Sequence, residues 1–293
     1  MPRSHPPTLI TLASRALVEE CGVARGDRIL VAVSGGPDSM ALLDVLGHLR
    51  EKLGFDLLAH GVDHGLRPEA SDELELVRRL AERIGVPFAS SRVALAPGGN
   101  LQARARSARY AALEAARVSG SAAFLATAHH ADDRAETLLL RLLRGSGPRG
   151  LAVLPPRAGV RIRPLLRARR TDVMLHLERH RVPFATDPSN RDRRYLRARV
   201  REELLPLATE LSPGIVEHLN SLADALLGED VPGELENGSI RVELGRAQRQ
   251  LLRRARALGQ RRAAVRLPGG WEARIHPTTG EATLVRAAER RQR

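Results

Sequence analysis

Six consecutive residues, Ser34–Ser39, have the types and order of a phosphate-binding loop: Ser-Gly-Gly-Pro-Asp-Ser. They follow the apolar run Arg28–Ser34 and lead directly into a helical pattern. Gly35 and Gly36 let the backbone approach an anion closely, while successive amides and a helix N-terminus attract negative charge. No Gly-Lys-Ser/Thr sequence follows, so this is not the phosphate loop of kinases and GTPases. We predict that the loop binds a phosphate group through Ser34, Gly35, Gly36, Pro37, Asp38 and Ser39; an ordinary glycine-rich turn would not need Ser and Asp there.

A second polar segment, Thr127–Thr137, has the sequence Thr-Ala-His-His-Ala-Asp-Asp-Arg-Ala-Glu-Thr. Asp132 or Asp133 can cap the helix that begins there, and Asp133 and Glu136 lie three apart on one helix face. The simpler interpretation is an exposed acidic first turn, which the helix dipole favours. At a strand end beside a phosphate loop, however, the same carboxylates could coordinate Mg²⁺ or bind a cationic substrate, and His129 could contact phosphate or transfer a proton.

Two groups of arginines have a spacing that suits an anionic ligand. In the helical segment that starts at Asn100, Arg106 and Arg109 share a face and could neutralise charge on an attacked phosphorus; an Arg-rich solvent face is the alternative. Further along, a turn at Asp187–Asn190 precedes a basic helix in which arginines recur three and four apart. These are Arg194, Arg197 and Arg201, which could contact nucleic-acid phosphates or pair with Glu202 and Glu203.

The elements that would position these residues alternate between short apolar runs and longer amphipathic segments. Such alternation is typical of a doubly wound, mostly parallel sheet with crossover helices. The predicted strands are Arg28–Ser34, Phe55–Asp63, Pro87–Val93, Ala122–Ala128 and Val160–Leu166, and the predicted helices are Asp38–Lys52, Ala70–Gly85, Leu101–Ser119 and Ala131–Arg144. Since ligands bind at the carboxyl ends of such strands, the loops starting at Ser34, Asp63, Pro97 and His129 should converge on one site.

After Leu166 the pattern becomes helical and then changes again. We expect helices near Arg169–Arg181, Arg194–Ala208 and Pro213–Leu227, a linker at Gly228–Gly238, and a small C-terminal module with strands Ser239–Leu244, Trp271–His276 and Glu281–Val285 around a basic helix, Arg246–Leu258. The predicted division is therefore a catalytic domain with a basic helical extension over residues 1–207, and a helical linker with a small module over residues 208–293.

Composition excludes several classes of protein. The chain has 293 residues, 43% of them hydrophobic, but only four Phe, two Tyr and one Trp, so aliphatic side chains must form the core. Its single cysteine, Cys21, excludes an intramolecular disulfide, a four-thiolate zinc site and an iron–sulfur cluster held by this chain alone. No stretch of ~18 apolar residues occurs, so we expect a cytoplasmic protein with no membrane partner.

Positive charge is concentrated in one part of the chain. The net charge is +13, and residues 141–210 contain 17 basic and 7 acidic residues. A basic block on an otherwise balanced chain indicates a polyanionic partner, of which nucleic acid is the commonest. Solvated helix faces in an arginine-rich composition are the alternative, but composition does not explain the clustering.

Taken together and in order, these motifs resemble the bacterial tRNA(Ile)-lysidine synthetase family of ATP pyrophosphatases. The resemblance covers residues 28–207. It rests on the phosphate loop, Val62–Arg67 (VDHGLR), Asn100 with Arg106, Arg109 and Tyr110, the His-His-x-Asp-Asp-x-x-Glu-Thr segment, Arg163–Leu166 (RPLL) and Asp187–Asn190 with the basic helix. Two positions depart from the family pattern: Ala198 stands where the basic helix usually has Asn, and Gly61 precedes Asp63 near the expected adenine contacts.

The resemblance implies a reaction and a role for each motif. Members of the family use ATP to adenylate the wobble cytidine of the isoleucine tRNA with a CAU anticodon, and the ε-amine of free L-lysine then displaces AMP. ATP and Mg²⁺ would be the cofactors, that tRNA and lysine the partners, and a homodimer is a possible assembly. Asp38 would hold the metal and pyrophosphate, Arg109 the reacting phosphate, and Asp133, Glu136 and His129 would serve the chemistry. Asp63 would contact the nucleotide, while Arg106, Asp187, Asn190, Arg194, Arg197 and Arg201 would contact tRNA or substrate.

Three other functions remain open from the sequence. A tRNA cytidine thiolase of the same superfamily would need more cysteines than Cys21 to carry sulfur. An RNA-independent, ATP-dependent amide-forming ligase would not need the basic block. A catalytically silent RNA-binding protein would be expected to have lost Asp38 or the acidic pair, and both are present.

Overall fold

The computed structural model describes residues 7–63, 70–93, 101–186, 195–227, 234–245, 248–249, 251–252, 264–275 and 282–287. The expectations for Pro97, Asp187, Asn190 and Arg194, and for most of the helix predicted at Arg246–Leu258, lie outside these residues.

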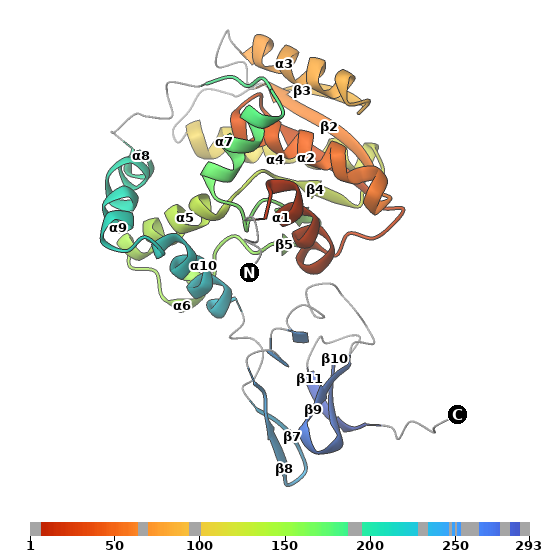
Figure 1. Cartoon of the computed structure of the whole chain (residues 1–293), viewed down its shortest axis with the longest axis vertical. Coiled ribbons are helices and arrows are strands. Elements are labelled where there is room, and N and C mark those ends of the chain that lie inside the picture. Colours follow the sequence, from red (N-terminus) through yellow and green to blue (C-terminus); the bar gives the residue numbers. More distant parts are fainter. Residues whose placement is uncertain are drawn as a thin grey trace, which may run out of the picture.

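A mostly parallel sheet forms the centre of the N-terminal body (Figure 1). Its order is β3-β2-β1-β4-β6-β5, so β1 lies centrally and the chain runs outward from it in both directions. Neighbours from β3 to β6 are parallel, and β5 is antiparallel to β6. The strands are β1 (Arg28–Val33), β2 (Asp56–Asp63), β3 (Phe88–Arg92), β4 (Phe124–Ala126), β5 (Arg157–Ala158) and β6 (Arg161–Ile162).

Helices cover both faces of this sheet, as the alternating pattern predicts. The bounds are α1 (Leu9–Ala16), α2 (Pro37–Leu53), α3 (Ala70–Arg83), α4 (Leu101–Ser119), α5 (Ala131–Leu143), α6 (Pro148–Leu151) and α7 (Arg170–Arg179). One core joins β1 and β2 to apolar residues of α1, α2, α3 and α7, including Leu42, Leu46 and Leu177. On the other face, Leu113 of α4 packs against Leu30 and Leu125. The predicted doubly wound architecture is confirmed.

The fifth predicted strand, Val160–Leu166, is much shorter than expected. Only Arg161–Ile162 pairs with β4, and β5 adds a two-residue antiparallel edge strand through a hairpin at Gly159, whose φ is +59°. Pro164 cannot donate to a ladder, so pairing ends before it, and Leu165 and Leu166 turn into the core instead. The sheet therefore has six strands rather than five.

The basic segment after residue 194 forms a bent helical stretch. It comprises α8 (Leu196–Arg199), a wider π-helical turn at Val200–Leu204 and α9 (Leu205–Leu211), followed by α10 (Ile215–Leu226). Pro206 has no N–H to donate to the preceding turn, and the predicted single helix is interrupted just before it. Leu205, Val216 and Leu219 pack on Ala135 and Leu138 of α5. The helices after residue 195 are thus anchored to the helix that carries the acidic pair.

The C-terminal strands have a hydrophobic core of their own. They are β7 (Glu234–Asn237), β8 (Ile240–Glu243), β9 (Ala264–Leu267), β10 (Trp271–Ile275) and β11 (Ala282–Arg286), arranged as a hairpin and a three-stranded antiparallel sheet (Figure 1). The prediction of a linker over Gly228–Gly238 is wrong for its last part, because Leu235 is buried and residues 234–237 pair with β8. β9 was not predicted. A small C-terminal module after the helices is confirmed.

Candidate active site

The pocket lies at the carboxyl ends of three neighbouring strands. It has a volume of about 960 Å³ and is lined by Ser34 after β1, Asp63 at the end of β2 and His129 after β4. The predicted convergence of these three loops is therefore confirmed. Three cationic side chains from other elements complete the lining: Arg109 of α4, Arg170 of α7 and Arg201 of the π-helical turn. The pocket thus combines a phosphate-type loop with charges of both signs.

The phosphate loop is held together by its own serines. Gly36 caps α2 with φ −71° and ψ 161°, and Pro37 starts the helix, where its missing N–H has no intrahelical partner to lose. The hydroxyl of Ser39 donates to the Gly36 carbonyl at 2.9 Å and accepts from the Ser34 amide at 3.2 Å. The loop is therefore preformed around the N-terminus of α2.

Gly35 is the one loop position that no other residue fits. Its φ of +78° lies in the left-handed region, and a Cβ there would come within 2.9 Å of both Cβ and the carbonyl oxygen of Glu73 on α3. The Gly35 carbonyl also accepts from the Ala185 amide at 2.9 Å. This glycine lets α3 and the segment after α7 close against the loop.

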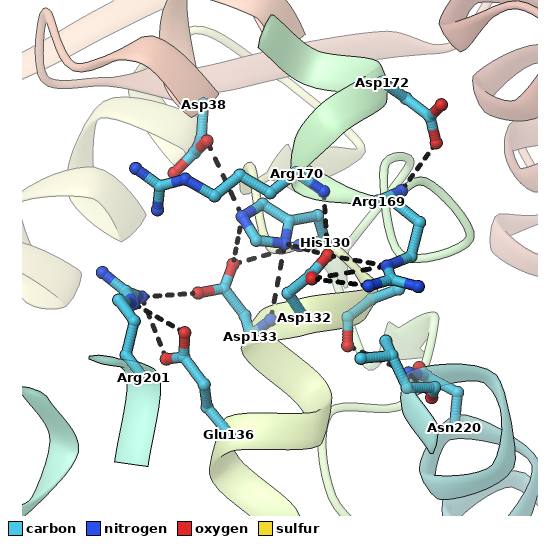
Figure 2. Close-up of polar contacts among 12 residues, drawn as sticks. Asp38, His130, Asp132, Asp133, Glu136, Arg169, Arg170, Asp172, Arg201 and Asn220 are labelled. Carbon is cyan, nitrogen blue, oxygen red and sulfur yellow. Dashed lines mark hydrogen bonds and ion pairs between the residues drawn. The ribbon is translucent and has the colours of Figure 1, made fainter. Parts of the chain in front are cut away.

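Asp38 points into the site from the first turn of α2. Its Oδ1 is buried and has no hydrogen-bond partner among the described residues, while Nε2 of His130 lies 3.7 Å away (Figure 2). Burial raises the pKa of Asp38 above its ordinary value, and nearby Asp133 raises it further against the opposing effect of His130. A buried carboxylate oxygen left without a partner is the kind of atom that a cation or a protonated ligand group satisfies.

His130, rather than an aspartate, caps α5. Its side chain accepts from the Asp133 amide at 3.4 Å, and the Asp133 carboxylate accepts from the His130 amide at 3.1 Å. The imidazole is fully buried between carboxylates, with Asp132 at 3.5 Å from Nδ1 and Asp133 at 3.5 Å from Nε2 (Figure 2). Although burial lowers the pKa of His130, Asp132, Asp133 and Asp38 together raise it above its usual value. The surrounding carboxylates therefore favour the protonated form of His130 more than burial disfavours it.

Asp132 ties this centre to α7. Its carboxylate accepts from the Arg170 amide at 2.8 Å and from the Arg169 guanidinium at 3.3 Å (Figure 2). Burial alone would raise the pKa of Asp132, but the bonds from His130 and Arg170 bring it well below the usual range. The contact fixes the first turn of α7 and places Arg170 at the pocket.

The acidic pair and the basic helix contact each other. Nε of Arg201 lies 2.6 Å from Glu136 Oε1, and its Nη2 lies 3.3 Å from Asp133 Oδ1. Arg197 approaches the same two carboxylates at 3.4 and 3.6 Å. Asp133 lines the pocket, whereas Glu136 is buried behind it and does not. The alternative interpretation, pairing with Glu202 and Glu203, does not describe Arg197 and Arg201, and Glu203 pairs instead with Arg199.

His129 and Arg109 both line the pocket, His129 from the loop after β4 and Arg109 from α4. Burial lowers the pKa of His129 to about 4, and Nδ1 lies 3.0 Å from the Thr127 hydroxyl, so the imidazole is neutral at neutral pH. Burial also lowers the pKa of Arg109. Arg106 stacks on Tyr110 at 5.1 Å from the ring centroid, as Arg109 does at 5.6 Å, but Arg106 does not line the pocket.

Comparisons with known proteins decide the family. A family model described as a PP-loop domain matches residues 10–208. A tRNA(Ile)-lysidine synthase from Geobacter sulfurreducens is 41% identical over 225 residues, covering 74% of this chain and 48% of that protein. A tRNA(Ile)-lysidine synthase from Thermobifida fusca is 40% identical over 225 residues, covering 75% of this chain and 68% of that protein.

The chain belongs to the tRNA(Ile)-lysidine synthase family.

The match to the lysidine synthase family covers the N-terminal body in particular. The chain spans about half the length of the Geobacter protein, so the match concerns a part of that relative. Among solved structures, a U34-tRNA thiolase from Methanococcus maripaludis with a [4Fe-4S] cluster has a TM-score of 0.63, at 18% identity over 78% of this chain and 81% of that one. That likeness supports the fold alone. No helix in the described part of the chain is long and apolar enough to cross a membrane.

Proposed function

We propose that this chain, like the lysidine synthases it matches, uses ATP to join free L-lysine to the wobble cytidine of the isoleucine tRNA with a CAU anticodon. The cytidine carbonyl oxygen would attack the α-phosphorus of ATP and release pyrophosphate. The ε-amine of lysine would then attack the base carbon, AMP would leave with the oxygen, and the amine would lose a proton. The product base, lysidine, would pair with adenosine and change the tRNA from methionine to isoleucine identity.

The observation that carries this proposal is the unpartnered Oδ1 of Asp38 beside the preformed loop. Mg²⁺ prefers carboxylate oxygens together with substrate phosphates and water. Asp38 and Asp133 both approach His130 Nε2, at 3.7 and 3.5 Å, so two carboxylates converge on one corner of the pocket. This donor set fits Mg²⁺: Asp38 would hold it with the phosphates, and the ion would neutralise their charge.

The phosphates of ATP would lie on the loop Ser34–Ser39, facing Arg170 and Arg201. These guanidiniums line the same pocket as the loop, and fixed positive charge stabilises the charge that develops on an attacked phosphorus. Arg109 would act from the α4 side. Neutral His129 would contribute a hydrogen bond rather than a charge. Asp63, at the end of β2, would contact the nucleoside.

Lysine enters such a site as a cation, so it needs a carboxylate. Asp133 lines the pocket and Glu136 does not. We assign the lysine contact to Asp133, while Glu136 holds Arg201 in place. Asp133→Asn should therefore raise the KM for lysine or stop the second step with adenylated tRNA accumulating, and Glu136→Gln should affect lysine less.

Incubation with ATP, radiolabelled lysine and a CAU-anticodon transcript tests the function. Label should enter the transcript. No label should enter a transcript with another wobble base, or the CAU-anticodon transcript when the Asp38→Asn variant replaces the unaltered chain. ATP–pyrophosphate exchange without tRNA, and no label in RNA, would instead identify an RNA-independent amide-forming ligase.

Binding and assembly are the remaining parts of the proposal. The tRNA would lie on the basic segment that includes Arg194, Arg197 and Arg201. Arg106, Asp187 and Asn190 would also contact the tRNA or substrate. The protein would work in the cytoplasm, where its tRNA is, and could form a homodimer; light scattering during gel filtration measures its mass directly.

A further inference from the structure

Away from the pocket, three histidines surround one buried aspartate between α2 and α7. Asp44 and His48 are four residues apart on α2, and His176 and His180 are four apart at the end of α7. Residues with this spacing lie on one face of a helix, and a pair of histidines so spaced is a familiar way for a helix to bind metal. The two helices pack against each other and bring both pairs together.

The ligand atoms of three of these residues lie close together. Oδ2 of Asp44 is 2.9 Å from Nε2 of His176 and 4.0 Å from Nδ1 of His180, and all three ligand atoms lie within 4.8 Å of one another. Ligand atoms bound tetrahedrally to zinc at ~2.0–2.2 Å are separated by roughly 3.3–3.5 Å. Small rotations of the side chains would therefore give the distances that zinc requires.

The two histidines of the α7 end approach Asp44 differently, although their rings are stacked with centroids 4.2 Å apart and an angle of 23° between them. His176 Nε2 is hydrogen-bonded to Oδ2 of Asp44 at 2.9 Å. At 4.0 Å, His180 Nδ1 is beyond hydrogen-bond distance of that carboxylate. Burial lowers the pKa of His180, and His176 lowers it further. A neutral imidazole has a lone pair to offer a metal.

The surroundings supply a support and an entry path. Arg83 of α3 lies 3.9 Å from the other carboxylate oxygen of Asp44, so its positive charge is near the carboxylate but not at Oδ2. Asp44 and His176 are almost completely buried, whereas 29% of the His180 side chain and 44% of the His48 side chain are exposed. Solvent can therefore reach the cluster from the side of His48, where a water could take a fourth position. His48 itself is engaged, because its Nδ1 donates to the Asp44 carbonyl at 2.9 Å.

We propose that Asp44, His176 and His180 form a binding site for one divalent transition-metal ion, and that zinc fits it best. Two imidazole nitrogens and one carboxylate oxygen are a donor set that suits zinc, whereas Mg²⁺ prefers oxygen alone. The ion would join α2 to α7. Since α2 begins at the phosphate loop and α7 begins at Arg170, it would also fix the spacing of these two parts of the pocket.

Zinc titration of the full-length chain, stripped of metal and saturated with Mg²⁺, tests the site. We expect one Zn²⁺ per chain by calorimetry, and a rise in melting temperature at equimolar Zn²⁺. His180→Ala removes a partly exposed ligand and should fold, yet it should weaken Zn²⁺ binding by about 100-fold or more and abolish the rise. His218→Ala, which removes an exposed histidine of α10, is the matched control and should bind like the unaltered chain.

Co²⁺ provides an independent readout. Its visible absorption should be that of a tetrahedral complex and should be lost in His180→Ala and in Asp44→Asn. The proposal is overturned if Zn²⁺ does not bind under these conditions, or if it binds equally well to the His180→Ala variant, since the ion would then lie elsewhere, for example at Asp38 and His130. Should Asp44→Asn fail to fold, the His180→Ala result still decides.

Discussion

The guanidinium of Arg201 holds Glu136 at two points, with Nε 2.6 Å from Oε1 and Nη2 2.9 Å from Oε2. The sequence predicts a tRNA contact for Arg201 and a role beside the metal or lysine for Glu136. Their pairing links the basic segment to α5 and places Arg201 over the pocket. The side chain of Glu136 is only 2% exposed, so this contact is also a determinant of stability.

Removing Arg201 should destabilise the fold. Arg201→Ala leaves a buried carboxylate with Arg197 as its remaining partner at 3.4 Å, and the expected loss is about 2–4 kcal/mol by urea denaturation. Arg199→Ala is the matched control, because its pair with Glu203 is largely exposed and should contribute less than about 1 kcal/mol. Equal losses in the two variants would contradict a structural role for the Arg201–Glu136 pair.

Asp38→Asn should abolish formation of AMP while leaving tRNA affinity nearly unchanged. The substitution removes a charge from the phosphate loop but touches no part of the basic segment. Release of pyrophosphate and a filter-binding assay with tRNA measure the two properties separately. A parallel fall in both would mean that Asp38 supports the fold rather than the phosphate chemistry.

Gly35→Ala should destabilise the chain by more than its positive φ alone accounts for. The new Cβ meets Glu73 at 2.9 Å in addition to adopting a positive φ. Gly26→Ala is the control, since Gly26 has a φ of +87° with nothing within 4 Å of a Cβ. We expect about 1 kcal/mol of destabilisation for Gly26→Ala, and a larger loss together with weaker ATP binding for Gly35→Ala. Similar values in the two variants would show that the contact with α3 has no effect.

His129 predicts a specific dependence of stability on pH. Its pKa falls to about 4 in the folded chain, below the ordinary value of 6.5, so the unfolded chain binds more protons between these values. Stability from this residue is therefore fully present above pH 6.5 and is lost as the pH falls toward 4. Compared with His129→Gln, the unaltered chain should lose up to about 3 kcal/mol over this interval. Parallel curves for the two proteins would show that His129 titrates normally.

The basic segment should control the salt dependence of tRNA binding. Replacing Arg194 and Arg197 with Ala, while leaving Arg201 in the pocket, should weaken binding and reduce the slope of log affinity against log salt by roughly 1.4–1.8, since each lost phosphate contact removes about 0.7–0.9. The affinity for ATP should not change. Arg266 and Arg274 on β9 and β10 form the comparison pair; a change of slope there, and none in the first variant, would place the RNA on the C-terminal module.

Patterns along the chain predicted the elements better than the contacts between them. The predicted bounds of α4 agree with the structure, because its apolar residues repeat with a helical period throughout. His130 was missed because Ser, Thr, Asp and Asn are the preferred caps, which directed attention to Asp132 and Asp133. Because His130 directly precedes the predicted helix Ala131–Arg144, its position alone could have indicated the cap. Its approach to Asp38 joins residues 92 positions apart and follows only from the strand order 2-1-4.

The same limit explains the other differences. The sequence predicts a tRNA contact for Arg201, but the packing of α9 and α10 on α5 turns it toward Glu136. The short edge strand β5 and the strand β7 contain too few apolar residues to produce a pattern. The contact of Arg201 with Glu136 joins residues 65 positions apart, so no local spacing records it. The strands β5 and β7 pair with nearby residues, and there it is their short, polar sequences that hide them.

Among the residues that the structure describes, the C-terminal strands share no hydrophobic cluster with the six-stranded sheet, and this affects how the chain loses its structure. Two cores that do not interpenetrate are separate cooperative units, so heating should produce two transitions in a calorimeter rather than one. A substitution such as Ala273→Asp in the smaller core would melt that module first, while circular dichroism of the remaining helices and ATP binding persisted. Each unfolding midpoint measured on the whole chain therefore reports either the body around the central sheet or the C-terminal module. The effect of a substitution must be measured on the transition of the unit that contains it.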